Sequence, residues 1–319
     1  MDEKLLKRKM RSEIGSYGWA LLIYYLLMNV CVFTALILSI VVQMMQKVAS
    51  GDYFSELAMD TDTIMGNGWG YLLACALAVI FIRLWKGKAF FGGIWKSEKN
   101  MKPAAFWQIV CVFISAQLLF QICATIQELV LNQFGLSVLE SMELASVNSD
   151  TLSMFLYTTL AAPVVEEIIF RGLVLRGLEK YGKRFAILIS AILFGLFHGN
   201  IVQSPYAFMV GLVLGYVAME YNILWSMVLH MVNNLVLGDT LSRLTQGLGE
   251  IGSALITEMV ILVCAVAALV SLIRNRKQVM NYHRANLPDW RCWWAFSTAP
   301  GVIVMFLIME INAFSMLFM

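Results

Sequence analysis

The composition of the chain indicates a membrane protein. Its 319 residues are 60% hydrophobic and only 14% charged, and its mean hydropathy is strongly positive. A soluble domain has no use for so much apolar surface, and the net charge of +2 says little by itself. The composition therefore excludes soluble globular proteins. It predicts an all-α, polytopic bundle of transmembrane helices.

Apolar runs that could cross a bilayer recur along the whole chain. A span needs about 20 apolar residues, and recognisable breaks such as Gly199-Asn200 and Glu220-Tyr221-Asn222 separate the shorter runs. We predict eight or nine spans. They cover residues 17–45, 69–85, 103–131, 152–175, 185–198, 206–219, 223–237, 254–273 and 292–319.

The segments between the spans alternate in charge. Segments 1–16, 86–102, 176–184 and 274–291 are rich in lysine and arginine, whereas segments 50–67 and 132–150 carry acids and no base. Basic loops of membrane proteins stay on the cytoplasmic side. We therefore predict a multi-pass protein of the cell membrane with a cytoplasmic N-terminus.

Three charged side chains stand inside the fourth apolar run. A charge in hydrocarbon costs roughly 2.5 to 3.5 kcal/mol, so such residues usually face a bundle interior and have a function. Because residues four apart share a helix face, Glu167 and Arg171 can form an ion pair, while Glu166 points elsewhere. Pro163 has no N–H for the carbonyl of Thr159, which predicts a kink or a free acceptor beside Glu166. The alternative is an ion pair that only holds two transmembrane helices together.

The other strong polar groups of the apolar core also recur at helical spacing. Phe194 and His198 are four residues apart, as are His230 and Asn234, so each pair shares one face of its helix. With a rise of 1.5 Å per residue, the depths in the membrane are roughly 15, 21, 12 and 18 Å for Glu166, His198, His230 and Asn234. Residues that only pack have no reason to agree in depth. We therefore expect these groups to meet.

Such a cluster can hydrolyse a peptide bond in more than one way. A carboxylate and a histidine can deprotonate a shared water, while a second histidine and an amide stabilise the oxyanion. Alternatively, Glu166, His198 and His230 could bind zinc, although no H-E-x-x-H is present and the spacing gives no support for a metal. Serine catalysis is less attractive, because no G-x-S-x-G is present and neither Ser190 nor Ser226 shows a sign of activation.

The three motifs together resemble the CAAX prenyl endopeptidase and bacteriocin-processing family, called CPBP or Abi. The family pattern is E-E-x-x-x-R, then F-x-x-x-H, then H-x-x-x-N or D. This chain has the same motifs in the same order, and the similarity extends over about residues 152–237. We accordingly divide one integral membrane domain into N-terminal helices (1–151), a core (152–238) and C-terminal helices (239–319).

The resemblance implies roles for individual residues and an architecture for the site. Glu166 with His198 would activate the water, and His230 with Asn234 would stabilise the oxyanion. Glu167 and Arg171 would be the orienting ion pair, and Phe194 would pack the site. The resemblance further implies a glutamate-dependent protease with a conical polar cavity among the central helices and no obligatory metal.

Substrates implied by the resemblance are membrane-embedded or membrane-associated peptides and proteins. Prenylated C-terminal tails, signalling peptides and bacteriocin peptides are the candidates, and we expect a bacterial protein that contacts the lipid bilayer and no nucleic acid. The rival interpretation is a noncatalytic immunity or scaffold protein that binds a peptide or a sensor. A transporter is less attractive, because the sequence has no second polar cluster for an opposing gate.

Overall fold

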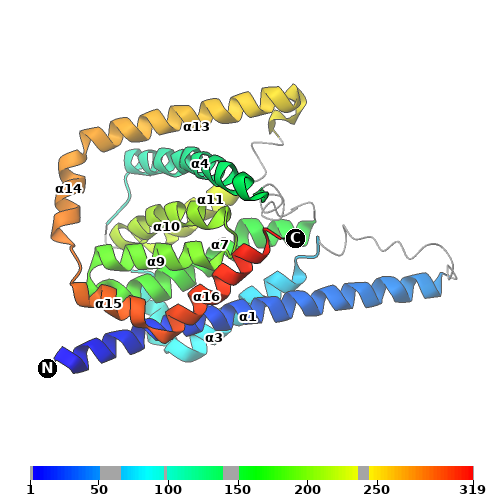
Figure 1. The fold of residues 1–319 in the computed structure, drawn as a ribbon, viewed down its shortest axis with the longest axis horizontal. Helices are drawn as coiled ribbons and strands as arrows, with labels where there is room; N and C mark the ends of the chain where they lie inside the picture. The colour runs from blue at the N-terminus through cyan, green and yellow to red at the C-terminus, as the bar shows by residue number, and fades with distance from the viewer. Residues whose placement is uncertain (1–2, 51–65, 97–98, 139–150, 236–243, 319) are drawn as a thin grey trace.

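The structure is a computed structural model that describes residues 3–50, 66–96, 99–138, 151–235 and 244–318. Within these residues the regular secondary structure is helical, without strands, so the all-α prediction is confirmed. The long helices run side by side as a bundle (Figure 1). Most residues of the two predicted acidic segments, namely 51–65 and 139–150, lie outside the described residues. The end of the predicted seventh span and the core boundary at residue 238 also lie outside them.

Among the described residues, five helices are long and apolar enough to cross a membrane. They are α1 (Glu3–Ala49), α3 (Trp69–Ile94), α4 (Pro103–Leu131) with η1 (Asn132–Phe134), the segment Leu152–Tyr181, and α13 (Gly249–Arg274). The helices α15 (Trp290–Thr298) and α16 (Pro300–Ser315) meet at an angle of 60° and make a sixth if they form one span. These helices define a multi-pass membrane protein.

By length and apolar character, fewer of the described helices qualify as spans than the eight or nine predicted. The predicted fifth, sixth and seventh spans are α9 (Lys183–Phe197), α10 (Gln203–Glu220) and α11 (Ile223–Asn233). At 1.5 Å per residue, the 11 residues of α11 cover about 17 Å of a hydrocarbon core about 30 Å thick. Many of their apolar side chains pack inside the protein, where Ile189 and Leu214 are fully buried. Hydropathy does not distinguish a protein interior from lipid.

The segment Leu152–Tyr181 is the central element of the bundle. It consists of α6 (Leu152–Leu156), η2 (Tyr157–Ala161), α7 (Ala162–Glu166), η3 (Glu167–Leu175), α8 (Arg176–Leu178) and η4 (Glu179–Tyr181). Both η2 and η3 are π-helical, a wider conformation that is frequent at functional sites. Every residue of η3 is buried, and η3 contacts α3, α9, α10 and α11. The charged motif is thereby placed in the interior.

Polar side chains fix where two of the core helices begin. Thr151 caps α6 by accepting a hydrogen bond from the backbone N–H of Met154 at 3.2 Å. Asn222 caps α11 in the same way, accepting from the backbone N–H of Trp225 at 2.9 Å. Each cap satisfies one of the free N–H groups at a helix N-terminus. The cap at Asn222 sets the register of α11 and thus the face that its later polar residues present.

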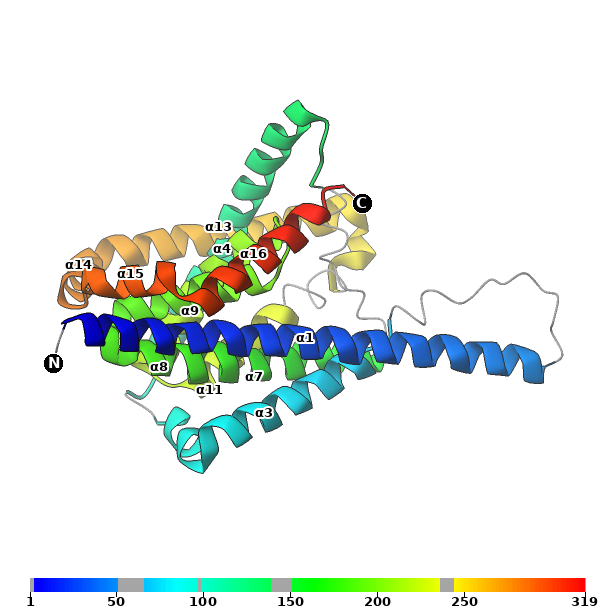
Figure 2. The same ribbon diagram turned by 60° about the horizontal axis from the view of Figure 1, so that its bottom comes forward.

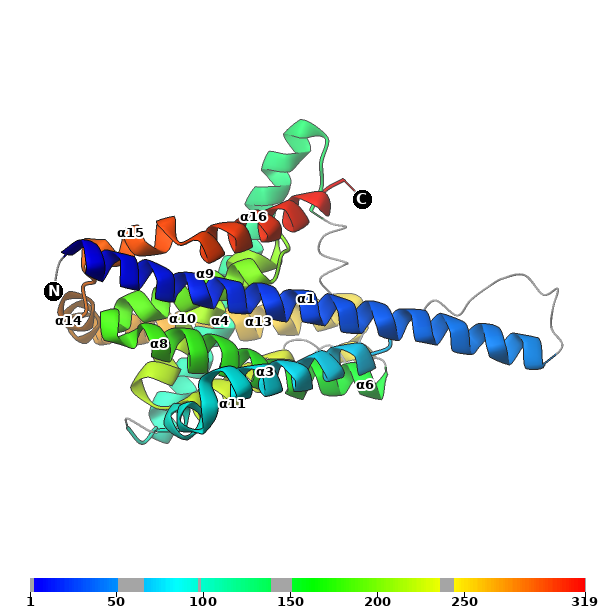
Figure 3. The same cartoon turned by 90° about the horizontal axis from the view of Figure 1, so that it is seen from below.

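Glycines allow the first and last helices to pack closely. A Cβ atom at Gly18 of α1 would overlap the backbone of Gly301 in α16, and one at Gly301 would overlap the carbonyl oxygen of Gly15. Figures 2 and 3 show α15 and α16 running along α1. Small residues permit such an approach between membrane helices, where dispersion contacts replace the hydrophobic effect as the driving force.

We expect Gly18→Ala to destabilise the protein by about 1 to 3 kcal/mol, because the added methyl group overpacks the contact with α16. The matched control is Gly92→Ala, since Gly92 also lies in a helix but has open space at its Cβ position. Thermal unfolding of both variants in detergent, followed by size-exclusion chromatography, measures the difference. Equal midpoints for the two variants would contradict the close packing of α1 on α16.

Candidate active site

Glu167 is the centre of the polar cluster. Its Oε1 lies 3.1 Å from Nη1 of Arg171, one turn further along the same helix, and 3.0 Å from Nδ1 of His230 in α11. Its Oε2 accepts a hydrogen bond of 2.5 Å from the hydroxyl of Ser226, also in α11. Glu167 and Arg171 are fully buried. The carboxylate is therefore compensated by a cation and by two groups of a second helix.

Arg171 is held by charge and by an aromatic ring as much as by hydrogen bonds. Its guanidinium carbon lies 4.4 Å from the centroid of the Phe194 ring, which is favourable for a desolvated cation. Its Nη2 donates to the carbonyl of Gly211 in α10 at 3.3 Å. Among the described residues, neither its Nε nor its Nη1 has an aligned hydrogen-bond acceptor. Arg171 thus joins η3 to both α9 and α10.

Glu166 and Glu167 contact different nitrogens of His230. The Oε2 atom of Glu166 is 3.7 Å from Nε2 of His230, and the Glu166 side chain is 15% exposed. In the part of the chain that the structure describes, the imidazole within 4.0 Å of the Glu166 carboxylate is that of His230 and not that of His198. His230 therefore stands between two carboxylates, an arrangement that the sequence did not predict.

His198 lies at the end of α9 with a defined orientation. Its Nδ1 is 2.8 Å from the carbonyl oxygen of Phe194. A carbonyl only accepts, so Nδ1 carries the proton and Nε2 of the neutral ring has a free lone pair. The next residue, Gly199, has a φ of +54°, and its carbonyl accepts a hydrogen bond of 2.9 Å from Asn312 of α16. The last helix thus supports the turn that follows His198.

Phe194 forms a shared wall of the site. Its ring packs edge-on against His198 at a centroid distance of 4.9 Å and against His230 at 5.6 Å. A third edge-on contact, at 5.0 Å, is made with Phe170 of η3. The two imidazoles are consequently held on one buried ring although they come from different helices.

Asn234, directly after α11, is held by a carbonyl that the proline of the charged motif leaves free. In η2 the N–H of Ala162 bonds to the carbonyl of Tyr157, five residues earlier. In this register the carbonyl of Thr158 would pair with residue 163, a proline without an N–H. Asn234 Nδ2 donates to this carbonyl at 2.9 Å. The prediction assumed α-helical spacing and named the carbonyl of Thr159, whereas Asn234 bonds to that of Thr158.

The serines of the site have structural contacts. Ser226 donates to Glu167 and also lies 3.0 Å from the carbonyl of Leu214, and Ser190 donates to the carbonyl of Phe170 at 2.8 Å. These contacts give neither serine an activating histidine. Ser226 was not predicted as a site residue, although its spacing of four from His230 places both side chains on one helix face.

The described residues contain no group of three or more histidine, cysteine or acidic side chains placed to hold a metal ion. The possible zinc ligands Glu166, His198 and His230 therefore do not converge as a ligand set. His230 is also engaged through Nδ1 by Glu167.

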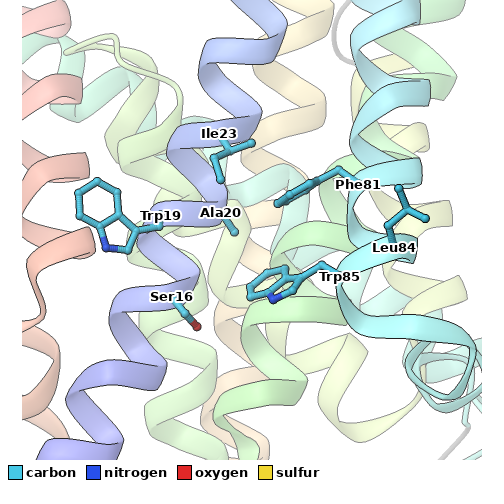
Figure 4. Close-up of a pocket in the computed structure, with 7 residues that line it drawn as sticks. All are labelled: Ser16, Trp19, Ala20, Ile23, Phe81, Leu84 and Trp85. Atoms are coloured by element: carbon cyan, nitrogen blue, oxygen red, sulfur yellow. The ribbon is translucent and has the colours of Figure 1, made fainter.

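Three cavities lined by described residues lie around α1 and α3. The first, of about 530 Å³, is apolar and is formed by Ser16, Trp19, Ala20, Ile23, Phe81, Leu84 and Trp85 (Figure 4). A second of about 310 Å³ contains Lys86 and Arg176. The third reaches Ile169 and Leu173 of η3. None of the three includes a predicted site residue, and the conical polar cavity stays a prediction.

Fold and site together define a multi-pass helical membrane protein with a cluster of two carboxylates and two imidazoles. Residues 148–236 match the family model described as type II CAAX prenyl endopeptidase, Rce1-like. This segment contains all the predicted site residues, so the resemblance is confirmed there, and the match supports an intramembrane endopeptidase in general. The chain matches no curated protein and no solved structure.

We expect Glu167→Ala and Arg171→Ala each to cost about 3 to 5 kcal/mol of stability, because each leaves the other charge buried without its partner. Glu166→Gln should have little effect, since this side chain is partly exposed and lies 3.7 Å from His230. Folded yield and thermal midpoint in detergent measure the difference. Equal values for the three variants and wild type would refute a structural role of the ion pair.

Proposed function

We propose that the protein is an intramembrane endopeptidase that hydrolyses a peptide bond of a membrane-associated peptide or protein. The observation that carries the proposal is the buried chain from Arg171 through Glu167 to His230, which ends 3.7 Å from a second carboxylate, Glu166. An ion pair that only holds helices together has no need of an imidazole between two carboxylates. The family match over residues 148–236 supports the same class.

In the proposed reaction, Glu166 and His198 activate the water. The Nδ1–H of His198 is engaged by the carbonyl of Phe194, which leaves Nε2 as an acceptor. The partly exposed carboxylate of Glu166 supplies the second acceptor for the same water. As the water oxygen bonds to the scissile carbonyl carbon, its proton passes to this pair. The proton then moves to the leaving nitrogen when the C–N bond breaks.

His230 and Asn234 stabilise the negative oxygen of the tetrahedral intermediate. Glu167 accepts the Nδ1–H of His230. In the proposed reaction His230 carries a second proton, on Nε2, which donates toward the reacting groups, and the Glu167 carboxylate balances the charge of this imidazolium. Asn234 gives one N–H to the carbonyl of Thr158 and keeps the second for the oxyanion. Preorganised donors of this kind account for a large part of the rate enhancement in acyl transfer.

We propose that the reaction does not require a metal. The alternative is a zinc ion on Glu166, His198 and His230, three residues that do not form a ligand set in the arrangement described above. A carboxylate and two imidazoles supply both a base and hydrogen-bond donors by themselves. Every step proposed here therefore uses side chains of this protein alone.

For the substrate, we propose a prenylated C-terminal peptide first, in keeping with the description of the matching family. Signalling and bacteriocin peptides are alternatives for the same reaction. We further propose a location in a bacterial cell membrane with the N-terminus in the cytoplasm. The basic N-terminal segment and Lys180 and Lys183 of the core support this orientation through the positive-inside rule.

We expect wild-type protein to generate new termini among the membrane peptides of its host, and Glu166→Gln to generate none. The amide cannot take a proton from water, and the rate should fall at least about 100-fold, the lower end of the range for general acid–base catalysis. Mass spectrometry of peptide termini, at equal abundance of both proteins, measures the outcome.

The matched control is Glu258→Gln in α13, whose exposed carboxylate accepts a hydrogen bond from Gln121 of α4. This variant should cleave like wild type. Activity that survives a chelator supports the metal-free mechanism, and activity that is lost on chelation and restored by zinc refutes it. Identical termini for wild type and Glu166→Gln would favour a noncatalytic immunity or scaffold protein.

A further inference from the structure

A chain of hydrogen bonds leads from the outer helix α4 to Asn234. The amide of Gln117 in α4 donates to the hydroxyl of Tyr206 in α10 at 2.8 Å. That hydroxyl donates to Oδ1 of Asn233 at 2.9 Å. Nδ2 of Asn233 donates to Oδ1 of Asn234 at 3.0 Å, and Asn234 in turn donates to the carbonyl of Thr158 at 2.9 Å. Every group donates in the same direction along the chain.

This common direction fixes which way each amide faces. Because the hydroxyl of Tyr206 occupies Oδ1 of Asn233, the amide nitrogen of Asn233 is the end that meets Asn234. Without the hydroxyl, the Asn233 amide can flip and place its oxygen against the oxygen of Asn234. Two acceptors then face each other, and a hydrogen bond is lost. Asn234 would lose the orientation that points its remaining N–H toward the site.

We propose that Tyr206 and Asn233 are positioning residues that set the amide orientation of Asn234. The inference rests on the proposed role of Asn234 in stabilising the oxyanion. Neither residue is one of the named positions of the three motifs, and their side-chain hydrogen bonds in the described structure connect them to Gln117, to each other and to Asn234. Their effect on the reaction is transmitted through Asn234.

The structure offers a substitution that removes only the hydroxyl. The Tyr206 ring packs against Phe120 of α4 at a centroid distance of 5.3 Å, and phenylalanine preserves this contact. Tyr216 provides the control on the same helix, since it is 40% exposed and its ring packs against Tyr282. Asn233→Asp is an independent test, because it replaces the donor that meets Asn234 with an acceptor.

We expect Tyr206→Phe and Asn233→Asp each to lower kcat roughly tenfold, less than the loss of about 100-fold or more on removing an oxyanion donor, with KM within about twofold. The double variant should be no slower than the slower single variant, because both changes break one chain. The assay uses a synthetic peptide that spans a Glu166-dependent cleavage site, in detergent, with thermal midpoints measured in parallel.

The outcomes separate this inference from the proposed function. Rates for Tyr206→Phe that equal those of Tyr216→Phe would overturn the positioning role while Glu166-dependent cleavage remains. A rise in KM with unchanged kcat, or losses that multiply in the double variant, would also overturn it. Absence of any Glu166-dependent cleavage by wild type would overturn the proposed function, and the positioning role with it.

A second, independent observation concerns α14 (Arg276–Ala285), which joins α13 to α15. Figure 1 shows α14 running across the direction of the long helices, at the end of the bundle that also holds the N-terminus. Segment 274–288 contains no acidic residue. Its neighbours are the end of an apolar span and Trp290 at the start of α15, a residue type that is enriched at the membrane interface.

Tyr282 is half-buried against the protein, and the other side chains of α14 are exposed. The hydroxyl of Tyr282 donates to Glu220 of α10 at 3.2 Å. With 3.6 residues per turn, the side chains on the side opposite Tyr282 are mainly basic. They are Arg276, Lys277, Met280 and Arg284, all of them exposed. The outer face thus combines three cations with one apolar side chain.

We propose that this outer face binds the headgroups of anionic phospholipids in the adjacent leaflet. A transverse helix between two membrane segments lies at headgroup depth, where cations meet lipid phosphates and an apolar side chain can enter the acyl boundary. Each of the three cations is attracted to an anionic surface within a Debye length of it. The face therefore fits an anionic lipid surface by charge, depth and side-chain chemistry.

The test uses the full chain in nanodiscs of phosphatidylcholine, with or without about 30% phosphatidylglycerol, an anionic lipid. A fluorophore on Met280→Cys, in a background without other reactive cysteines, reports access to a water-soluble quencher. We expect quenching to be at least about twofold weaker in the anionic discs than in the neutral ones. This protection should vanish in the triple variant Arg276→Gln, Lys277→Gln and Arg284→Gln. It should also vanish in about 1 M salt, where the Debye length is roughly 3 Å.

The control for the helix itself is Tyr282→Phe, which keeps the three cations and removes the contact with Glu220. Lipid-dependent protection should persist in this variant. Equal quenching in both kinds of disc, with the three cations present, would overturn the proposed lipid contact. Protection that survives removal of the three cations would overturn it as well.

Discussion

The burial of the Glu167 carboxylate is the constraint on which the site depends. A charge in an apolar interior is tolerated only when it is paired and hydrogen-bonded. Glu167 meets this requirement with Arg171 of its own helix and with Ser226 and His230 of α11. The same bonds that make its burial possible also orient the His230 ring, with its Nδ1–H toward Glu167 and its Nε2 toward Glu166. The contacts of the Glu167 carboxylate therefore both stabilise the fold and orient the His230 imidazole.

The second determinant is the π-helical register around Pro163. With α-helical spacing Pro163 deprives the Thr159 carbonyl of its partner, and with the π-helical spacing of η2 it deprives the Thr158 carbonyl. Asn234 takes this acceptor. A defect in the backbone hydrogen bonding of one helix thereby anchors a side chain at the end of another. Side chains of neighbouring helices commonly bond to freed backbone carbonyls in membrane proteins, because no water is available there to satisfy them.

The spacing of the motifs predicted more of the site than of the fold around it. Helical periodicity placed Glu167 and Arg171 on one face, and the structure confirms their ion pair. It also turned Glu166 away from that pair, yet Glu166 and Glu167 both reach His230. Periodicity did not reveal that His230, rather than His198, is the imidazole within 4.0 Å of Glu166. Nor did it reveal the contacts of Ser226, Tyr206 and Asn233, because these join helices whose relative rotation the sequence does not state.

The sequence by itself determined the environment and the local geometry of this protein. Composition and hydropathy define a helical membrane bundle, and a period of 3.6 assigns side chains to helix faces, because both depend on neighbouring residues alone. Only the tertiary structure decided which helices are interior, which backbone register surrounds Pro163, and which polar groups meet across helices. These features arise from packing among segments that are distant in the chain, as between Glu167 and His230, and no local pattern encodes that packing.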